Sequence, residues 1–319
     1  MVIENEGISC RQIETCELCA EQGKVLYSNL RDQLFSAPGT WAIRACPKCA
    51  LLWSDPQPFP DQIHKLYRTY YTHSRSPQFS SFRSRGKAKL VKDALAKALF
   101  WKPYIFQSDN LHLQGLPPGD LIEVGCGSGG FLAALAQEGW KCHGIDFDES
   151  AIAEARKIPG VSAEVAELTQ RAFPANSFDA VVMNNVIEHI WNPIATVTEC
   201  YRILRPGGRL VMITPNSRAL GHVLYRQDWR GLEVPRHLFI YNYGTIRALA
   251  KKTGFLNAVA FSSSGGASGR EILKASAEIA ARAKRPTRAT PPLTIIETAL
   301  GIVGIPVGEW IVLIATKQA

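Results

Sequence analysis

The stretch LIEVGCGSGG, residues 121 to 130, decides the fold class of this chain. It is an apolar segment that runs into glycines and then into helical spacing over Gly130 to Glu138. A second apolar segment, Lys141 to Asp146, ends on an acid. A strand that ends in a glycine turn before a helix forms a cofactor site, because backbone N–H groups and the helix dipole converge there. The stretch therefore predicts an α/β sheet with a cofactor at this turn.

The glycines alone leave two kinds of cofactor open. Gly125, Gly127 and Gly130 fit G-x-G-x-x-G, and Asp146 follows at the spacing of a dinucleotide site. Glu123 favours a different cofactor, because a carboxylate repels a pyrophosphate but attracts an ammonium group or a water around one.

Strands and helices alternate after the Pro-Pro-Gly boundary at residues 117 to 119. Further strands are predicted at residues 161–166, 177–185 and 209–215, and a helix at 193–204 ends before a Pro-Gly stop. Ser150 is the expected N-cap of the helix that follows Asp146. This alternation predicts a doubly wound, mostly parallel sheet with right-handed crossovers.

The N-terminal region carries two C-x2-C pairs, Cys16 with Cys19 and Cys46 with Cys49. Each pair can present two thiolates, so together they predict a closed tetrahedral zinc site with a structural role. Iron in the same geometry, or four buried or redox-active thiols, are the alternatives.

Composition gives only broad limits. With 319 residues and 46% hydrophobic residues, the chain can bury one large core and a small satellite module. The net charge of +8 is modest and only weakly suggests an acidic partner. The N-terminus resembles neither a signal peptide nor a transit peptide, so we expect a cytoplasmic protein.

Two segments have competing interpretations. Residues 86–101 predict a basic helix, which is either a solvated face over packed apolar residues, a membrane-surface helix or a nucleic-acid contact. The apolar C-terminus is interrupted by Glu297, Pro306 and Glu309, so we expect a helix and a final strand at 309–316, with no transmembrane span. Membrane-surface contact is the alternative there.

Several motifs together resemble class I S-adenosylmethionine-dependent methyltransferases that carry an N-terminal four-cysteine zinc module. They are residues 121–130, 173–190, 202–216 and 229–255. The resemblance implies a Rossmann-like fold with a mostly parallel seven-stranded sheet, with S-adenosylmethionine and structural zinc as cofactors. It also implies four regions: a zinc ribbon at 1–56, a helical linker or lid at 57–116, a cofactor-binding core at 117–265 and a C-terminal segment at 266–319.

The resemblance also implies which residues contact the cofactor. Asp146 would accept the ribose hydroxyls and Phe147 would lie against the adenine, while the glycines would let the backbone approach the methionine part. The full set is Glu123, Gly125, Cys126, Gly127, Asp146, Phe147, Glu167 and Asn184.

Two histidines are candidate bases, since a hydroxyl nucleophile benefits from a base with a pKa near 7. His189 follows the fourth strand, and His237 lies in an irregular segment after the fifth. In a related ubiquinone-type branch two Glu and a His hold a divalent ion here; Asn185 replaces the first Glu, so we expect no catalytic metal.

The leading function is methyl transfer to a small molecule, a sugar or a lipid-linked intermediate, at oxygen. One alternative is an RNA base methyltransferase in which the zinc module and the basic helix contact RNA. The other is a non-catalytic or membrane-docked cofactor-binding module.

Overall fold

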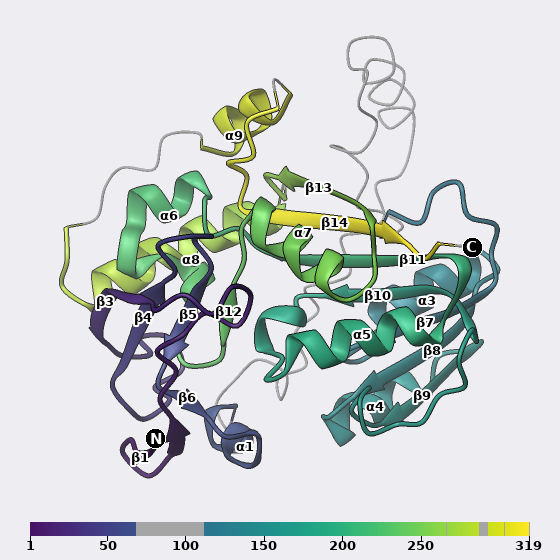
Figure 1. Cartoon of the computed structure of the whole chain (residues 1–319), viewed down its shortest axis with the longest axis horizontal. Helices are drawn as coiled ribbons and strands as arrows, with labels where there is room; N and C mark the ends of the chain where they lie inside the picture. Colours follow the sequence, from purple (N-terminus) through teal and green to yellow (C-terminus); the bar gives the residue numbers. More distant parts are fainter. Residues whose placement is uncertain (68–111, 266, 287–292, 303, 319) are drawn as a thin grey trace.

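The computed structural model describes residues 1–67, 112–265, 267–286, 293–302 and 304–318 (Figure 1). The predicted basic helix at 86–101, and most of the predicted linker at 57–116, lie outside the described residues.

A seven-stranded sheet forms the larger part of the molecule, in the order β13-β14-β11-β10-β7-β8-β9. Its strands are β7 (Asp120–Val124), β8 (Lys141–Asp146), β9 (Val161–Val165), β10 (Phe178–Asn184), β11 (Leu204–Pro215), β13 (Asn257–Ser263) and β14 (Trp310–Thr316). Neighbours from β11 to β9 are parallel, whereas β14 is antiparallel to both β11 and β13. The predicted doubly wound, mostly parallel sheet is confirmed, and the final strand lies inside it.

Helices cover both faces of this sheet. They are α3 (Gly130–Gln137), α4 (Glu149–Ala155), α5 (Pro193–Ile203) and α7 (Tyr243–Lys252). Successive side chains of β7 point to opposite faces: Leu121 packs in the core with α3 and α4, and Ile122 in the core with α5 and α7. Figure 1 shows α5 and α7 in front of the sheet and α3 behind it.

The expected N-cap of α4 was wrong. Asp148, not Ser150, caps this helix, and its carboxylate accepts hydrogen bonds from the N–H groups of Ser150 and Ala151. An acid two residues before Ser150 offers the same short acceptor and also complements the helix dipole.

The N-terminal module contributes three strands to a four-stranded antiparallel sheet, in the order β12-β5-β4-β3. These strands are β3 (Lys24–Leu30), β4 (Trp41–Ala45) and β5 (Leu52–Asp55). The fourth, β12 (Phe239–Ile240), comes from the segment after the fifth core strand and pairs with β5. The module is thus joined to the core by a shared sheet. A smaller sheet contains β1 (Val2–Glu4), β2 (Ser9–Arg11) and β6 (Gln57–Pro58).

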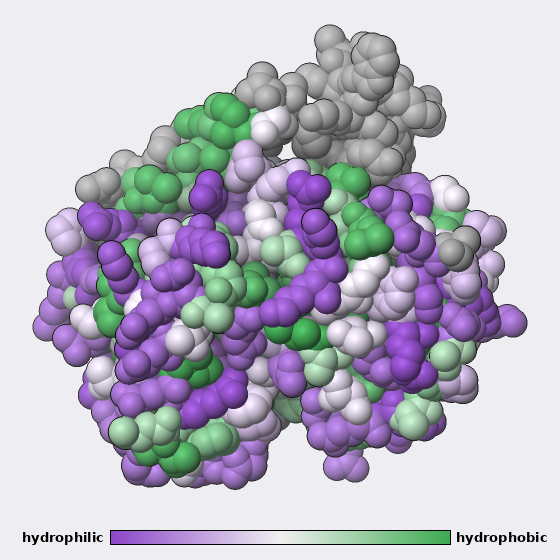
Figure 2. Space-filling view, viewed as in Figure 1, coloured by the Kyte–Doolittle hydropathy of each residue, from purple (hydrophilic) through white to green (hydrophobic). Residues whose placement is uncertain are grey.

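The remaining helices range from single 3-10 turns to the 16 residues of α8. They are η1 (Pro60–Gln62), α1 (Ile63–Leu66), η5 (Ile187–His189), α6 (Leu220–Tyr225), η6 (Arg226–Asp228), η7 (Arg230–Leu232), α8 (Ala267–Arg282) and α9 (Leu293–Ile302). None of the helices in the described ranges is long and apolar enough to cross a membrane. Ile295 and Ile296 on α9 are exposed, and Figure 2 shows hydrophobic residues at the upper edge of the molecule, where Figure 1 places α9.

Candidate functional site

The glycine loop is fastened to the end of β8. The N–H groups of Gly125 and Cys126 donate to the carbonyl oxygen of Ile145, at 2.8 and 3.1 Å. The N–H of Gly127 donates to Asp146 Oδ2 at 2.8 Å, and the other carboxylate oxygen accepts the N–H of Asp148 at 2.9 Å. Burial raises the pKa of Asp146. The loop and the acid that follows β8 therefore form one rigid unit.

The two glycines of the loop are required for different reasons. Both have left-handed φ angles, +70° at Gly125 and +52° at Gly127. A Cβ on Gly125 would lie 2.4 Å from Val186 Cγ2, so the protein's own side chain excludes a larger residue there. A Cβ on Gly127 would meet nothing within 4 Å, and this open space is where a ligand can approach the backbone.

Glu123 is buried beside this loop and is 2% exposed. Its Oε2 atom has no hydrogen-bond partner among the described residues. Burial, and then the negative charge of Asp146, raise the pKa of Glu123 to about 8. Buried polar atoms nearly always have a partner, so the orphaned oxygen fits a ligand that brings a donor, such as an ammonium group or its water.

The remaining predicted cofactor residues lie around the same edge of the sheet. Phe147 is 64% exposed, and its ring makes a T-shaped contact with Tyr67 at 5.7 Å between centroids. Glu167 is exposed, and Thr169 and Gln170 donate hydrogen bonds to its two carboxylate oxygens. Asn184 is the last residue of β10.

His189 is held in one tautomer by its neighbours. Its Nδ1 lies 3.0 Å from the carbonyl oxygen of Arg236 and 3.2 Å from the hydroxyl of Tyr67. A carbonyl only accepts, so Nδ1 carries the proton and Nε2 carries the lone pair. Burial lowers the pKa of His189, which favours this neutral form.

His237 packs against His189 with ring centroids 4.7 Å apart, but both of its nitrogens face protein acceptors. Nδ1 lies 2.8 Å from the carbonyl oxygen of Gly231, and Nε2 lies 3.3 Å from Glu233 Oε2. His237 is 4% exposed, and burial lowers its pKa to about 3. The structure brings the two predicted bases together. Both nitrogens of His237 face protein acceptors, whereas only Nδ1 of His189 does.

Glu188 is a further buried carboxyl at this place, which the sequence analysis missed. Thr214 Oγ1 donates to its Oε2 at 3.0 Å, while Oε1 has no partner among the described residues. Burial raises the pKa of Glu188 to about 8. Ligand atoms of Glu188, His189 and His237 lie within 4.8 Å of one another, close enough to share an ion. The expectation of no catalytic metal rested on Asn185, which stands in place of a glutamate. The sequence did not predict that His237 would lie beside Glu188 in the folded chain.

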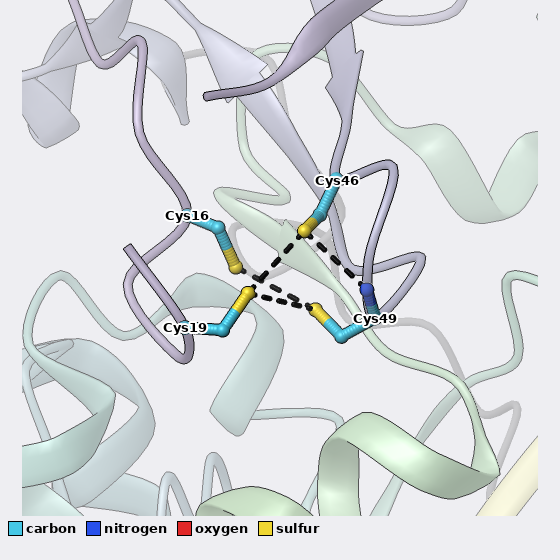
Figure 3. A group of neighbouring side chains, drawn as sticks. All are labelled: Cys16, Cys19, Cys46 and Cys49. Atoms are coloured by element: carbon cyan, nitrogen blue, oxygen red, sulfur yellow. Dashed lines mark hydrogen bonds between the residues drawn. The ribbon is translucent and has the colours of Figure 1, made fainter. Parts of the chain in front are cut away.

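The four predicted zinc ligands lie together in the N-terminal module (Figure 3). Their Sγ atoms lie 3.6 Å apart for Cys16 and Cys49, 3.4 Å for Cys19 and Cys46, and 3.8 Å for Cys19 and Cys49. A tetrahedral site with Zn–S bonds of 2.3 Å would space the sulfurs about 3.8 Å apart. The cysteines are arranged to hold such an ion.

The two cysteine knuckles have matching backbones. In each, the N–H of the alanine after the second cysteine, Ala20 or Ala50, donates to the carbonyl of the first cysteine. Both alanines are left-handed, with φ of +58° and +59°. All eight cysteines of the chain are free of disulfides.

The comparisons with known proteins agree with this fold. A family profile described as a methyltransferase domain matches residues 95–258. The order of the sheet and the helices on both of its faces define a Rossmann-like α/β protein. The chain belongs to the methyltransferase domain family.

Curated relatives match over shorter stretches. A probable S-adenosylmethionine-dependent methyltransferase of Mycobacterium tuberculosis is 34% identical over 151 residues, 45% of this chain and 55% of that protein. A ubiquinone biosynthesis O-methyltransferase of Pseudomonas entomophila is 32% identical over 110 residues, 33% of this chain and 47% of that protein. The matches thus span about half the length of these relatives.

Among solved structures, phosphoethanolamine N-methyltransferase 2 of Haemonchus contortus, in complex with S-adenosyl-L-methionine, aligns with a TM-score of 0.50 at 18% identity. The alignment covers 100% of this chain and 71% of that one. At this identity the likeness concerns the fold.

Proposed function

We propose that this protein transfers the methyl group of S-adenosylmethionine to an oxygen of a small molecule, a sugar or a lipid-linked intermediate, with His189 as the base. The observation that carries the proposal is the position of His189 after β10, with Nδ1 bound to the carbonyl of Arg236 and Nε2 left as an acceptor. Family membership, and the names of the relatives that act on oxygen or bind this cofactor, support it.

The residues around the glycine loop fit the proposed cofactor. The orphaned oxygen of Glu123 would accept a hydrogen bond from the ammonium group or its water, and the open space beside Gly127 would admit the methionine part. Asp146 keeps its loop contacts and would accept the ribose hydroxyls, with Phe147 against the adenine. When bound, S-adenosylmethionine supplies a methyl group on a positively charged sulfur.

The chain's own task in the reaction is to orient the acceptor and to take a proton. A hydroxyl that hydrogen-bonds to His189 Nε2 loses its proton to that nitrogen as it attacks. The imidazolium so formed is stabilised because Nδ1–H remains bound to Arg236 O. Exclusion of water and alignment of the nucleophile provide the rest of the rate enhancement.

The four cysteines, in this proposal, bind one zinc ion with a structural role. Their spacing leaves no open coordination position, so the ion stabilises the module and takes no part in the chemistry.

The function is tested by adding the purified protein and S-adenosylmethionine with a deuterated methyl group to a native extract, with and without prior RNase treatment. We expect the protein to label a small or lipid-extractable molecule, with the label on oxygen and no change after RNase. Label in RNA that disappears after RNase would favour the RNA alternative, and label on nitrogen would overturn the assignment of the acceptor atom.

A further inference from the structure

Asp32, in the N-terminal module, is held by four hydrogen bonds. Its carboxylate accepts the N–H groups of Leu34, Phe35 and Ala37, at 3.0, 3.0 and 3.1 Å. The fourth donor is Arg236 Nη1, at 2.8 Å from Oδ2. The side chain of Asp32 is only 4% exposed. A carboxylate with four donors has one available orientation.

The guanidinium of Arg236 joins three segments of the chain. Its side chain is 1% exposed, and besides Asp32 it donates to the carbonyl oxygen of Leu66 at 3.1 Å and to Glu233 Oε1 at 3.0 Å. It also lies over the ring of Phe35, 4.8 Å from the centroid. Arg236 therefore fastens the loop that contains it to the module and to the end of α1.

The backbone of Arg236 continues this connection to the proposed base. Its carbonyl oxygen is the acceptor for His189 Nδ1 at 3.0 Å, so side chain and carbonyl of one residue link Asp32 to His189. The neighbouring N–H of Leu238 donates to the carbonyl oxygen of Glu188, which adds a second tie between this loop and η5.

Two carboxylates and two guanidinium groups are buried together around this loop in the described part of the chain. The negative charges of Asp32 and Glu233 face the positive charges of Arg230 and Arg236, and Arg230 also contacts Glu233. Burial alone would raise the pKa of Glu233, but the neighbouring cations hold it well below its usual range. With His237 neutral, the charges of these four described side chains sum to zero, so removal of one carboxylate makes the surroundings of His189 more positive.

We propose that Asp32 is a positioning residue for methyl transfer: it fixes Arg236 so that its carbonyl holds His189 in the tautomer with the proton on Nδ1. The proposal rests on the proposed function in that it takes His189 as the base. The N-terminal module then has a role in orienting the active site besides its proposed metal binding.

The test is the tautomer of His189, measured by NMR of the ¹⁵N-histidine-labelled full chain, with the signal assigned through His189→Gln. Asp32→Asn keeps an acceptor for the N–H groups of Leu34 and Phe35, but turns a donor toward Arg236 and toward the N–H of Ala37. We expect Nδ1–H to predominate in the wild type and a mixture of tautomers in Asp32→Asn. Asp32→Glu, which restores the charge, should recover most of the wild-type signal.

Arg31→Gln is the matched control, since it breaks an exposed ion pair with Glu6 in the same module. Wild-type tautomer signals in both Asp32→Asn and the control would overturn the proposal. If Asp32→Asn does not fold, Arg236→Lys replaces it: lysine keeps the charge beside Asp32 but cannot bind all three segments, so the same mixture is expected.

The titration of His189 gives a second readout. Among the described residues, the charged and titratable groups that face this region are Tyr67, Glu188, Arg230, Glu233, Arg236 and His237. Loss of the negative charge of Asp32 makes the net charge around His189 more positive, which disfavours the imidazolium. The pKa of His189 should therefore fall in Asp32→Asn. A rise would contradict the proposed network.

Once an acceptor is identified, Asp32→Asn should lower kcat, by about 100-fold for a base displaced by about 1 Å, with the KM for S-adenosylmethionine unchanged. The NMR readout needs no acceptor. A protein with the predicted tautomer behaviour but no methyl transfer would refute the proposed function, while the control of the His189 tautomer by Asp32 would stand.

Discussion

The N–H of Gly127 donates a hydrogen bond to Asp146 Oδ2 at 2.8 Å. This bond joins the turn after β7 to the acid at the end of β8, so the backbone that faces the cofactor and the proposed ribose acceptor have a fixed geometry. Asp146 is therefore a structural partner of the loop as well as a candidate ligand-binding residue.

Gly125→Ala and Gly127→Ala should have different effects. At Gly125 the left-handed φ and the clash with Val186 together should cost about 2–4 kcal/mol of folding free energy. At Gly127 only the backbone term applies, about 1–2 kcal/mol, and loss of cofactor affinity should dominate. Urea unfolding and calorimetry separate the two, and equal stability losses would contradict this difference.

His189→Gln and His237→Gln should also separate. We expect His189→Gln to lower methyl transfer by about 10²–10⁴-fold with the affinity for S-adenosylmethionine unchanged. His237→Gln should instead reduce stability by about 1–3 kcal/mol, because it disturbs the buried contacts with Gly231 and Glu233. A larger rate effect from His237→Gln in a well-folded protein would reverse the assignment.

The burial of His189 also predicts a pH dependence. Since burial lowers its pKa from the ordinary value of 6.5, the base is neutral at pH 7, and the rate should fall only when the pH drops below 6.5. The pH profile of kcat measures this, and an acidic limb centred above pH 6.5 would be inconsistent with His189 as the titrating base.

The cysteine cluster predicts one zinc ion per chain after purification without added metal. Cys19→Ser should lose the ion, and its module should unfold at a lower temperature, because the ion connects the two cysteine pairs of the module. Cys10→Ser is the control, because Cys10 is buried but lies outside the cluster. A well-folded wild-type protein without metal would refute the zinc assignment.

The buried pair of Glu297 and Glu309 predicts that the free energy of unfolding falls as the pH rises. Both are buried and interact, and Gly221 N and Trp229 Nε1 donate to the two oxygens of Glu309. Burial, and then the charge of Glu309, raise the pKa of Glu297 from 4.5 to about 9. The unfolded chain binds fewer protons over this range, so stability is full below pH 4.5 and falls as the pH rises to about 9.

Glu297→Gln should remove much of that slope, because the amide can donate to Glu309 without the need to bind a proton. At pH 8 the variant should be more stable by roughly 1–3 kcal/mol. Unfolding free energies measured from pH 5 to 9 test this, and an unchanged slope would show that other groups control it.

Local patterns predicted the parts of the molecule that depend on neighbouring residues. The two C-x2-C pairs, the glycine turn before a helix and the strands 178–184 and 310–316 are all specified by short stretches, and the structure confirms the predicted sheet. The long-range contacts had no such pattern. Asp32 and Arg236 are single charged residues in irregular segments, and β12 is two residues long, so their partners appear only in the folded chain.

Calorimetric titration with S-adenosylmethionine and with NAD, on the wild type and on Asp146→Asn, shows which cofactor the protein binds and whether Asp146 holds it. Asp148→Asn is the control, because Asp148 caps α4 while its side chain takes no part in the glycine loop. We expect one-to-one binding of S-adenosylmethionine, no binding of NAD, a large loss of affinity in Asp146→Asn and near wild-type affinity in the control. Binding of NAD in place of S-adenosylmethionine, or undiminished affinity in Asp146→Asn, would contradict it.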